Sequence, residues 1–150
     1  MAKRSRPYTI LMADDDPDDC MLIEDALKEI GGAHTLRFVR DGEELADYLY
    51  SRGKYADSPD ALRPDLILLD LKMPKRDGRE AIGQLKSDPQ FRRIPVVALT
   101  TSTAADDINF SYDMGVNSYV TKPVTFRDLV DMMETLSKYW FELVELPPVE

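Results

Sequence analysis

The chain has 150 residues, of which 43% are hydrophobic and 31% are charged, and its formal net charge is −9. This length and composition are those of one soluble globular domain and exclude a disordered chain. The negative charge argues against a protein that binds nucleic acid or an anionic membrane surface.

Five strand–helix units follow one another along the chain. Each expected strand is a short apolar run, and each expected helix carries apolar residues at helical spacing. The expected strands are 8–13, 36–39, 65–69, 95–99 and 118–121. The expected helices are 17–30, one that follows Gly42, one that follows Gly78, 104–114, and 126 to about 143.

Turn and capping residues support these boundaries. Pro17 suits the first turn of a helix, and Thr125 suits the N-cap of the last helix. The Gly-Gly pair at 31–32 ends the first helix, and the Pro-Pro pair at 147–148 follows the last one. The polar stretch 51–64 is the longest loop, and we interpret it as a surface insertion rather than a linker.

Alternating strands and helices in one domain predict an α/β fold with a doubly wound, five-stranded parallel sheet. The run 65–69 is apolar without alternation, which is typical of a strand covered on both faces. We expect this domain to span 8–143, with a disordered tail at 1–7 and a C-terminal tail at 144–150. Because ligands of such sheets bind at the carboxyl ends of the strands, the residues that follow each strand are the functional candidates.

The sequence also favours a cytoplasmic protein without a membrane partner. No apolar run reaches the roughly 20 residues that a spanning helix needs, and the N-terminus lacks the apolar region of a secretory signal. The single cysteine, Cys20, has no partner for an internal disulfide.

Acidic residues follow the first and third expected strands, as the run 14–16 and as Asp70. Carboxylates that converge on one edge repel one another unless a cation neutralises them, and hard oxygen ligands without His or Cys favour Mg²⁺. Asp18 and Asp19 have a simpler interpretation, as charges that favour the N-terminus of a helix. Asp70 directly follows an apolar strand, where burial is costly, and a capping role near the core is its alternative.

The fourth and fifth expected strands end in Thr100-Thr101 and in Lys122. An ordinary ion pair is the simpler interpretation of Lys122, but its position makes it the natural counter-charge of Asp70. These residue types suit phosphoryl transfer, in which a carboxylate attacks phosphorus while Mg²⁺, an ammonium and a hydroxyl hold the phosphoryl oxygens. The product would be an acyl phosphate on Asp70.

These motifs together resemble the receiver domains of two-component response regulators. The matching segments are 10–17, 68–78, 95–101 and 118–123. The resemblance covers residues 8 to 143, and it implies a flavodoxin-like (βα)5 fold with strand order 2-1-3-4-5. It also implies a phosphoprotein of signal transduction, without enzymatic turnover beyond slow self-phosphorylation and dephosphorylation.

The resemblance further implies a role for each site residue. Asp70 is the phosphoacceptor, and Asp14 and Asp15 hold Mg²⁺ together with Asp70 and the backbone carbonyl of Lys72. The residues implied to bind phosphate or to switch conformation are Thr100, Thr101, Tyr119 and Lys122.

Two details of the resemblance concern the surroundings of the site. Lys72 departs from the family, where a small polar residue such as Asn is frequent. Because the implied ligand there is a backbone carbonyl, we expect metal binding to survive, with weaker Mg²⁺ affinity or an altered phosphoryl lifetime. The peptide bond before Pro123 is commonly cis in this family.

A closer resemblance exists with the small stand-alone regulators that accompany bacterial phytochromes. The shared features are the long loop before the third strand, the run 107–112, the run 122–126, and the tail 139–148. The only histidine, His34, lies beside a Gly-Gly turn, which makes an internal phosphoryl relay a poor alternative. The phosphoryl group must then come from a histidine on another protein, either a sensor histidine kinase or a phosphotransfer domain. A bacterial phytochrome is the candidate kinase.

Two other functions stay open at this point. In a haloacid-dehalogenase-type phosphatase, Asp14-x-Asp16 would supply the nucleophile and the acid, but Asp18 departs from that motif and the chain is short for a cap. A pseudo-receiver would only bind partners. Labelling by a small phosphodonor with Mg²⁺ separates these functions from a receiver.

The last helix leaves too few residues for an output domain, so we expect signalling through the surface of the domain itself. This helix carries one apolar stripe for the sheet, made of Phe126, Leu129, Val130, Met133, Ser137 and Trp140. A second stripe predicts a homodimer interface, made of Met132, Leu136, Tyr139 and Leu143. The alternative is that the end of the helix wraps onto its own core.

The preceding helix adds one residue to this expected interface. Ala105, Ile108 and Tyr112 form its expected core face. Phe110 points about 200° away from Ile108 at 100° per residue, so we expect it to be exposed.

Overall fold

We describe a computed structural model of the chain, covering residues 7–32, 34–58, 61–71 and 78–148. Its strands are β1 (Tyr8–Ala13), β2 (His34–Val39), β3 (Leu66–Leu69), β4 (Val96–Thr100) and β5 (Ser118–Thr121). Its α-helices are α1 (Pro17–Ile30), α2 (Gly42–Leu49), α3 (Gly78–Ser87), α4 (Ala105–Met114) and α5 (Phe126–Lys138).

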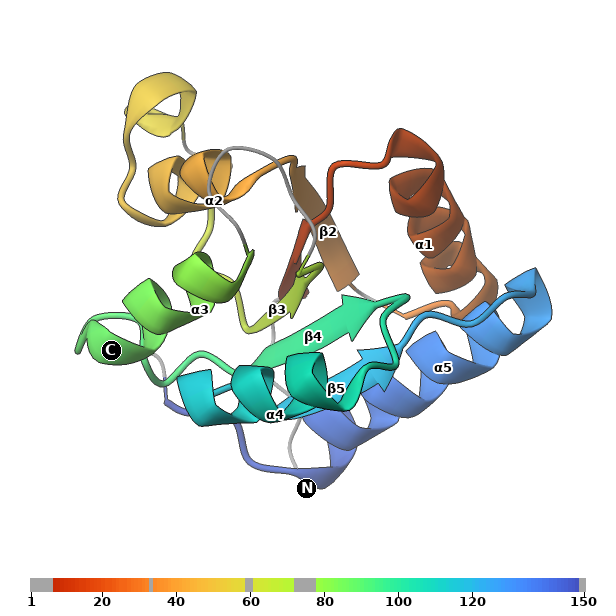
Figure 1. The fold of residues 1–150 in the computed structure, drawn as a ribbon. Coiled ribbons are helices and arrows are strands. Elements are labelled where there is room, and N and C mark those ends of the chain that lie inside the picture. Colours follow the sequence, from red (N-terminus) through yellow and green to blue (C-terminus); the bar gives the residue numbers. More distant parts are fainter. Residues whose placement is uncertain (1–6, 33, 59–60, 72–77, 149–150) are drawn as a thin grey trace.

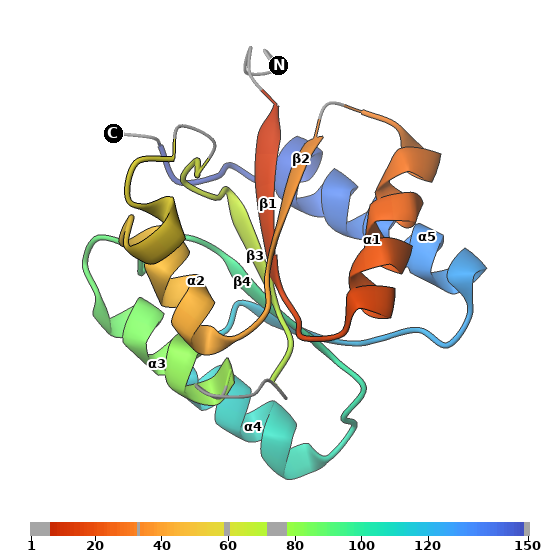
Figure 2. The same cartoon turned by 90° about the horizontal axis from the view of Figure 1, so that it is seen from above.

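The strands form one parallel sheet in the order β2-β1-β3-β4-β5, as expected. Helices α1 and α5 cover one face of the sheet, and α2, α3 and α4 cover the other (Figures 1 and 2). Because all strands run the same way, their carboxyl ends lie at one edge.

The apolar core consists of two layers, one on each face of the sheet. Alternate residues of β1 divide between them, with Leu11 in the layer under α2 and α3 and Met12 in the layer under α1 and α5. In β3, Ile67 and Leu68 divide in the same way, and both are fully buried. The apolar run without alternation therefore lies in a strand with a helical layer on each face.

Side chains cap three of the helices at their N-termini. Asp16 accepts a hydrogen bond from the backbone N–H of Asp18 at the start of α1, and Asp41 accepts one from Glu44 in α2. Thr125 accepts one from the N–H of Asp128, which confirms it as the N-cap of α5.

The loop 51–64 contains a short 3-10 helix, Gly53–Tyr55, that the sequence analysis did not predict. The ring of Tyr55 packs edge-on against the buried ring of Tyr48, with 5.1 Å between their centroids. The hydroxyl of Tyr48 also donates a hydrogen bond to the carbonyl of Leu62 at 2.7 Å. The loop is therefore attached to α2, as an insertion on the surface.

The expected core face of α4 is wrong. Ser111 is its buried residue, whereas Ala105 and Tyr112 are exposed. The reason is that α4 lies beside β5, an edge strand, where the Tyr112 hydroxyl accepts a hydrogen bond from the Tyr119 backbone N–H at 3.2 Å. Phe110 is exposed, as predicted.

The last helix buries a wider face than one stripe, because it packs against α1 as well as the sheet. Met132 and Leu136, expected at a dimer interface, are half-buried against the protein's own core. Phe126, expected against the sheet, is exposed. The helix wraps onto its own core here, and the exposed part of the second stripe is reduced to Tyr139 and Leu143.

The α-helical part of this last segment ends at Lys138, earlier than expected, and a π-helical turn continues to Leu143. That turn buries Phe141, whose ring stacks on Tyr8 with 4.2 Å between centroids. No helix in the described part of the chain is both long and apolar enough to cross a membrane.

Candidate functional site

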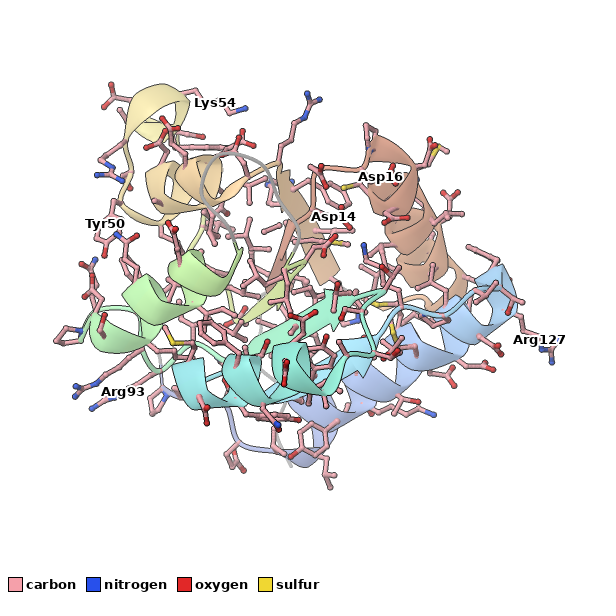
Figure 3. The ribbon with its side chains drawn as sticks, viewed as in Figure 1. Asp14, Asp16, Tyr50, Lys54, Arg93 and Arg127 are labelled. Carbon is pink, nitrogen blue, oxygen red and sulfur yellow. The ribbon has the colours of Figure 1, made fainter. Side chains whose placement is uncertain are left out.

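The acidic residues predicted to converge do so at the carboxyl edge of the sheet. Neighbouring strands β1 and β3 end in register at Ala13 and Leu69, and the N–H of Asp70 donates to the carbonyl of Ala13 at 2.9 Å. This pairing brings Asp14 and Asp70 side by side, with exposed fractions of only 1% and 8%. Figure 3 shows Asp14 at this edge and Asp16 beside the start of α1.

Three carboxylates at this edge fit a divalent cation. Asp14, Asp15 and Asp70 each offer one oxygen, and these oxygens all lie within 4.8 Å of one another. Burial raises the pKa of Asp14, and the charge of Asp70 raises it further, while hydrogen bonds from Lys122 and from the Asp16 N–H oppose the rise. Carboxylates that repel one another and offer only hard oxygen donors suit Mg²⁺ or a similar cation. Lys72, whose carbonyl the resemblance added to this set, lies outside the described residues.

Lys122 reaches the same edge from the end of β5. Its backbone N–H donates to the carbonyl of Thr100 at 2.8 Å, which fixes its position beside β4. Its Nζ lies 2.7 Å from Asp14, 2.7 Å from Asp19 and 3.1 Å from Asp70. The predicted pairing of Lys122 with Asp70 is therefore present in the structure.

The pKa of Lys122 reflects these contacts. Burial by itself would lower it, since the side chain is only 11% exposed. The hydrogen bonds to Asp14 and Asp19, together with the charges of Asp14 and Asp70, outweigh burial and raise the pKa above its ordinary value. The ammonium is thus a permanent positive charge beside Asp70.

Asp19 belongs to this cluster, although the sequence analysis assigned it only to the N-terminus of a helix. It lies in the first turn of α1, which starts at the carboxyl end of β1. A signal was available, because the first turn after such a strand lies at the same edge as the residues that follow the other strands.

The two threonines after β4 have different surroundings. Thr100 is fully buried, and its hydroxyl accepts a hydrogen bond of 3.5 Å from the N–H of Ser102, while Thr101 is exposed. Tyr119 is half-buried and donates from its hydroxyl to the carbonyl of Ser102 at 2.9 Å. The Ser102 hydroxyl donates to Asp107 of α4 at 2.6 Å. Ser102 therefore connects Thr100, Tyr119 and α4, which the sequence analysis missed.

Two expectations about other residues are also decided by the structure. The peptide bond before Pro123 is not cis, in contrast to what the resemblance implied. His34 starts β2, at the amino end of the sheet, and its ring lies 5.4 Å from that of Phe141. Because Asp70 lies at the carboxyl end, the structure agrees with the prediction that His34 relays no phosphoryl group.

Comparison with known proteins agrees with this geometry. A family model of the response regulator receiver domain matches residues 10–134. Response regulator Rcp1 of Synechocystis sp. is 43% identical over 141 residues, which cover 94% of this chain and 94% of that protein.

Two solved structures are similar over nearly the whole chain. The phosphorylated cyanobacterial phytochrome response regulator RcpA is 42% identical, with a TM-score of 0.87 over 95% of this chain and 99% of that one. The Mn²⁺-bound form of response regulator Rcp1 is 42% identical, with a TM-score of 0.84 over 95% and 100% of the two chains. The family match contains every residue that the fold assembles at the carboxyl edge.

Proposed function

The chain belongs to the response regulator receiver domain family, and on that premise we propose that Asp70 accepts a phosphoryl group from the histidine of a sensor kinase. The observation that carries this proposal is the position of Lys122, whose Nζ lies 3.1 Å from Asp70 and 2.7 Å from Asp14. This contact sets a fixed positive charge beside a nearly buried carboxylate at the end of β3.

The chemistry follows from these residues. An oxygen of Asp70 attacks the phosphorus, the bond from phosphorus to the histidine nitrogen breaks, and an acyl phosphate forms. The ammonium of Lys122 donates to a phosphoryl oxygen as negative charge gathers there, and the hydroxyl of Thr100 donates to another. We expect turnover to stop at this exchange and at slow hydrolysis of the acyl phosphate, as in a signalling protein.

Mg²⁺ is the cation that we propose for the carboxylates. Asp14, Asp15 and Asp70 would hold it with the carbonyl of Lys72, and it would supply positive charge to the phosphoryl oxygens. The Mn²⁺-bound form of the relative Rcp1 supports a divalent metal in a protein of this kind. The all-oxygen donor set favours Mg²⁺ in this chain.

The contacts of Ser102 suggest how phosphorylation reaches the surface. If Thr100 moves toward the phosphoryl group, the Ser102 N–H that it holds moves with it. Tyr119 and Asp107 are both attached to Ser102, so the surface of α4, β5 and α5 changes as well. We propose that this surface carries the output.

A homodimer is the form of output that we propose. Tyr139 is 46% exposed and Leu143 is 71% exposed, on the turn that follows α5, and Phe110 is exposed on α4. Exposed apolar side chains mark a protein–protein interface when they lie in one contiguous patch, and we propose that these three do so. Met132 and Leu136 would contribute only their outer atoms, because they are half-buried in the monomer.

The relatives also suggest the partner. The similar proteins include a phytochrome response regulator, so we propose a bacterial phytochrome as the sensor histidine kinase. A kinase that draws its phosphoryl groups from ATP acts in the cytoplasm, and we propose the same location for this chain.

Labelling of an Asp70→Asn variant tests the proposed function. Acetyl phosphate with Mg²⁺ should label the parent with a phosphoryl group that is stable in acid and labile in base. Asp70→Asn should take up none while it keeps the circular dichroism of the parent. Undiminished labelling of the variant would contradict the assignment and favour the phosphatase alternative, in which Asp14 is the nucleophile. An unlabelled parent would favour a pseudo-receiver.

The structure already counts against the phosphatase alternative. Its general acid would be Asp16, but that side chain accepts a hydrogen bond from the Asp18 N–H at 2.9 Å and caps α1. The side chain of Asp16 is therefore engaged at the N-terminus of α1 as its N-cap.

A further inference from the structure

The hydrogen bonds of Lys122 distribute its three protons among three carboxylates. An ammonium has three N–H donors, and the acceptors within 3.1 Å of this one are Asp14, Asp19 and Asp70. Of these contacts, the one to the proposed phosphoacceptor is the longest, at 3.1 Å against 2.7 Å for the other two.

Only two of these three carboxylates belong to the cation site. Asp14 and Asp70 share that site with Asp15, and Asp19 is not part of the group. A cation held by Asp14 and Asp70 competes with Lys122 for their oxygens, because an oxygen that binds a metal is a weaker acceptor for an ammonium. Asp19 is therefore the partner that Lys122 keeps when the metal site is filled.

We propose that Asp19 is a positioning residue for phosphoryl transfer, which anchors the ammonium of Lys122 in the metal-bound protein and leaves one of its N–H groups directed at Asp70. The anchor matters because a lysine side chain has four rotatable bonds and loses much entropy when it is held. Asp19 holds it from α1, a helix that packs against α5. The loop that carries Lys122 and the first turn of α1 are thus connected across the site.

This inference rests on the proposed function, since it assigns Asp19 a part in the reaction at Asp70. The proposed role of Asp19 is separate from metal binding, so the rate of phosphoryl transfer and the affinity for Mg²⁺ should respond differently to its loss. Loss of the anchor should slow phosphoryl transfer, whereas the affinity for Mg²⁺ should stay close to that of the parent.

The test compares Asp19→Ala with Asp18→Ala as the matched control. Asp18 is also an aspartate in the first turn of α1, but it is exposed and is not one of the three carboxylates that contact Lys122. Both variants lose one negative charge in the same helical turn, so long-range electrostatics change similarly. Only the first variant loses the contact of 2.7 Å.

The first measurement is the rate of labelling by acetyl phosphate at saturating Mg²⁺, alongside the Mg²⁺ dissociation constant from a titration. We expect Asp19→Ala to be labelled on the order of tenfold more slowly than the parent, because a misplaced catalytic group loses about this much or more. Its Mg²⁺ dissociation constant should differ little from that of Asp18→Ala. Asp19→Glu, which restores the carboxylate, should recover part of the rate.

The second measurement needs neither metal nor phosphodonor. In a double-mutant cycle, Asp19→Ala is introduced into the metal-free parent and into the metal-free Lys122→Met variant, and the change in the unfolding equilibrium constant is compared. The change should be about tenfold larger in the parent, because only the parent has the contact between Asp19 and Lys122 to lose.

Three results would overturn the proposal while the parent is still labelled. The first is an equal labelling rate for Asp19→Ala and Asp18→Ala, and the second is a Mg²⁺ dissociation constant of Asp19→Ala that rises in parallel with its loss of labelling rate. The third is a double-mutant cycle that shows no coupling between Asp19 and Lys122. An unlabelled parent would instead refute the proposed function itself.

Discussion

Replacing Lys122 with methionine tests the charge balance of the carboxylate site. Methionine keeps a long apolar stem and removes only the ammonium, whose side chain is 11% exposed and contacts Asp14, Asp19 and Asp70. Removal of one partner from a buried ion pair costs about 3–5 kcal/mol, because the other charge stays buried without compensation. Since Asp19 is partly exposed, we expect the lower end, about 3 kcal/mol of unfolding free energy in the metal-free protein.

The deficit should depend on pH. Burial raises the pKa of Asp14 even beside Lys122, and loss of the ammonium should raise it further. When a carboxyl group has a raised pKa in the folded state, the folded protein loses stability as the pH rises above the ordinary pKa of that group, which is 3.8 for Asp14. The deficit of Lys122→Met should therefore be largest at neutral pH and should shrink toward pH 4. Mg²⁺ at about 100 times each protein's own dissociation constant should stabilise parent and variant alike by about 2.7 kcal/mol by mass action, so the deficit should stay the same with and without metal.

Urea unfolding followed by the fluorescence of Trp140, the single tryptophan, measures these changes. Lys28→Met is the matched control, because Lys28 is 72% exposed and its ion pair with Glu24 is 3.8 Å long. The control should change the unfolding free energy by no more than about 0.5 kcal/mol. A Lys122→Met variant as stable as this control, or a deficit that does not shrink toward pH 4, would refute the charge-balance argument.

Three further predictions concern the metal, the pH response and the output surface. Asp15→Asn should lose both the Mg²⁺-dependent rise in melting temperature and the labelling by acetyl phosphate, and an unchanged melting shift would remove Asp15 from the metal site. Burial lowers the pKa of His34, with the charge of Glu142 opposing, so the unfolded chain takes up the proton first and stability falls as the pH drops below 6.5. His34→Gln should lack this part of the fall in urea unfolding, and an identical pH profile would contradict it. Tyr139→Glu with Leu143→Glu should abolish dimerisation in sedimentation runs before and after phosphorylation, whereas a variant that dimerises like the parent would place the interface elsewhere.

Most of the fold and of the cluster could be predicted because they depend on local patterns and on one rule of topology. Apolar runs and the capping residue Thr125 mark the elements, and the ends of parallel strands meet at one edge. The meeting of Asp14, Asp70 and Lys122 follows from that rule alone, since each directly follows a strand.

The features that could not be predicted depend on how elements pack against one another. The place of Asp19 in the first turn after β1 puts it at the right edge, but its contact with Lys122 depends on the position of α1 relative to the loop before α5, which no local pattern encodes. Tyr112 is exposed because α4 lies at an edge strand, where a tyrosine hydroxyl meets a backbone N–H. Met132 and Leu136 are half-buried because α5 packs on a helix as well as on the sheet. Helical periodicity identifies apolar stripes but not the neighbours that cover them.

The central claim is that the phosphoryl group forms an acyl phosphate on Asp70. Borohydride tests it most directly, since hydride reduces an acyl phosphate to a primary alcohol and so converts the modified aspartate into homoserine. The protein should be treated with acetyl phosphate and Mg²⁺, reduced, digested and sequenced by mass spectrometry. We expect homoserine at position 70 and aspartate at positions 14, 15 and 19. Homoserine at any of those three positions, with Asp70 intact, would contradict the assignment of Asp70 as the phosphoacceptor.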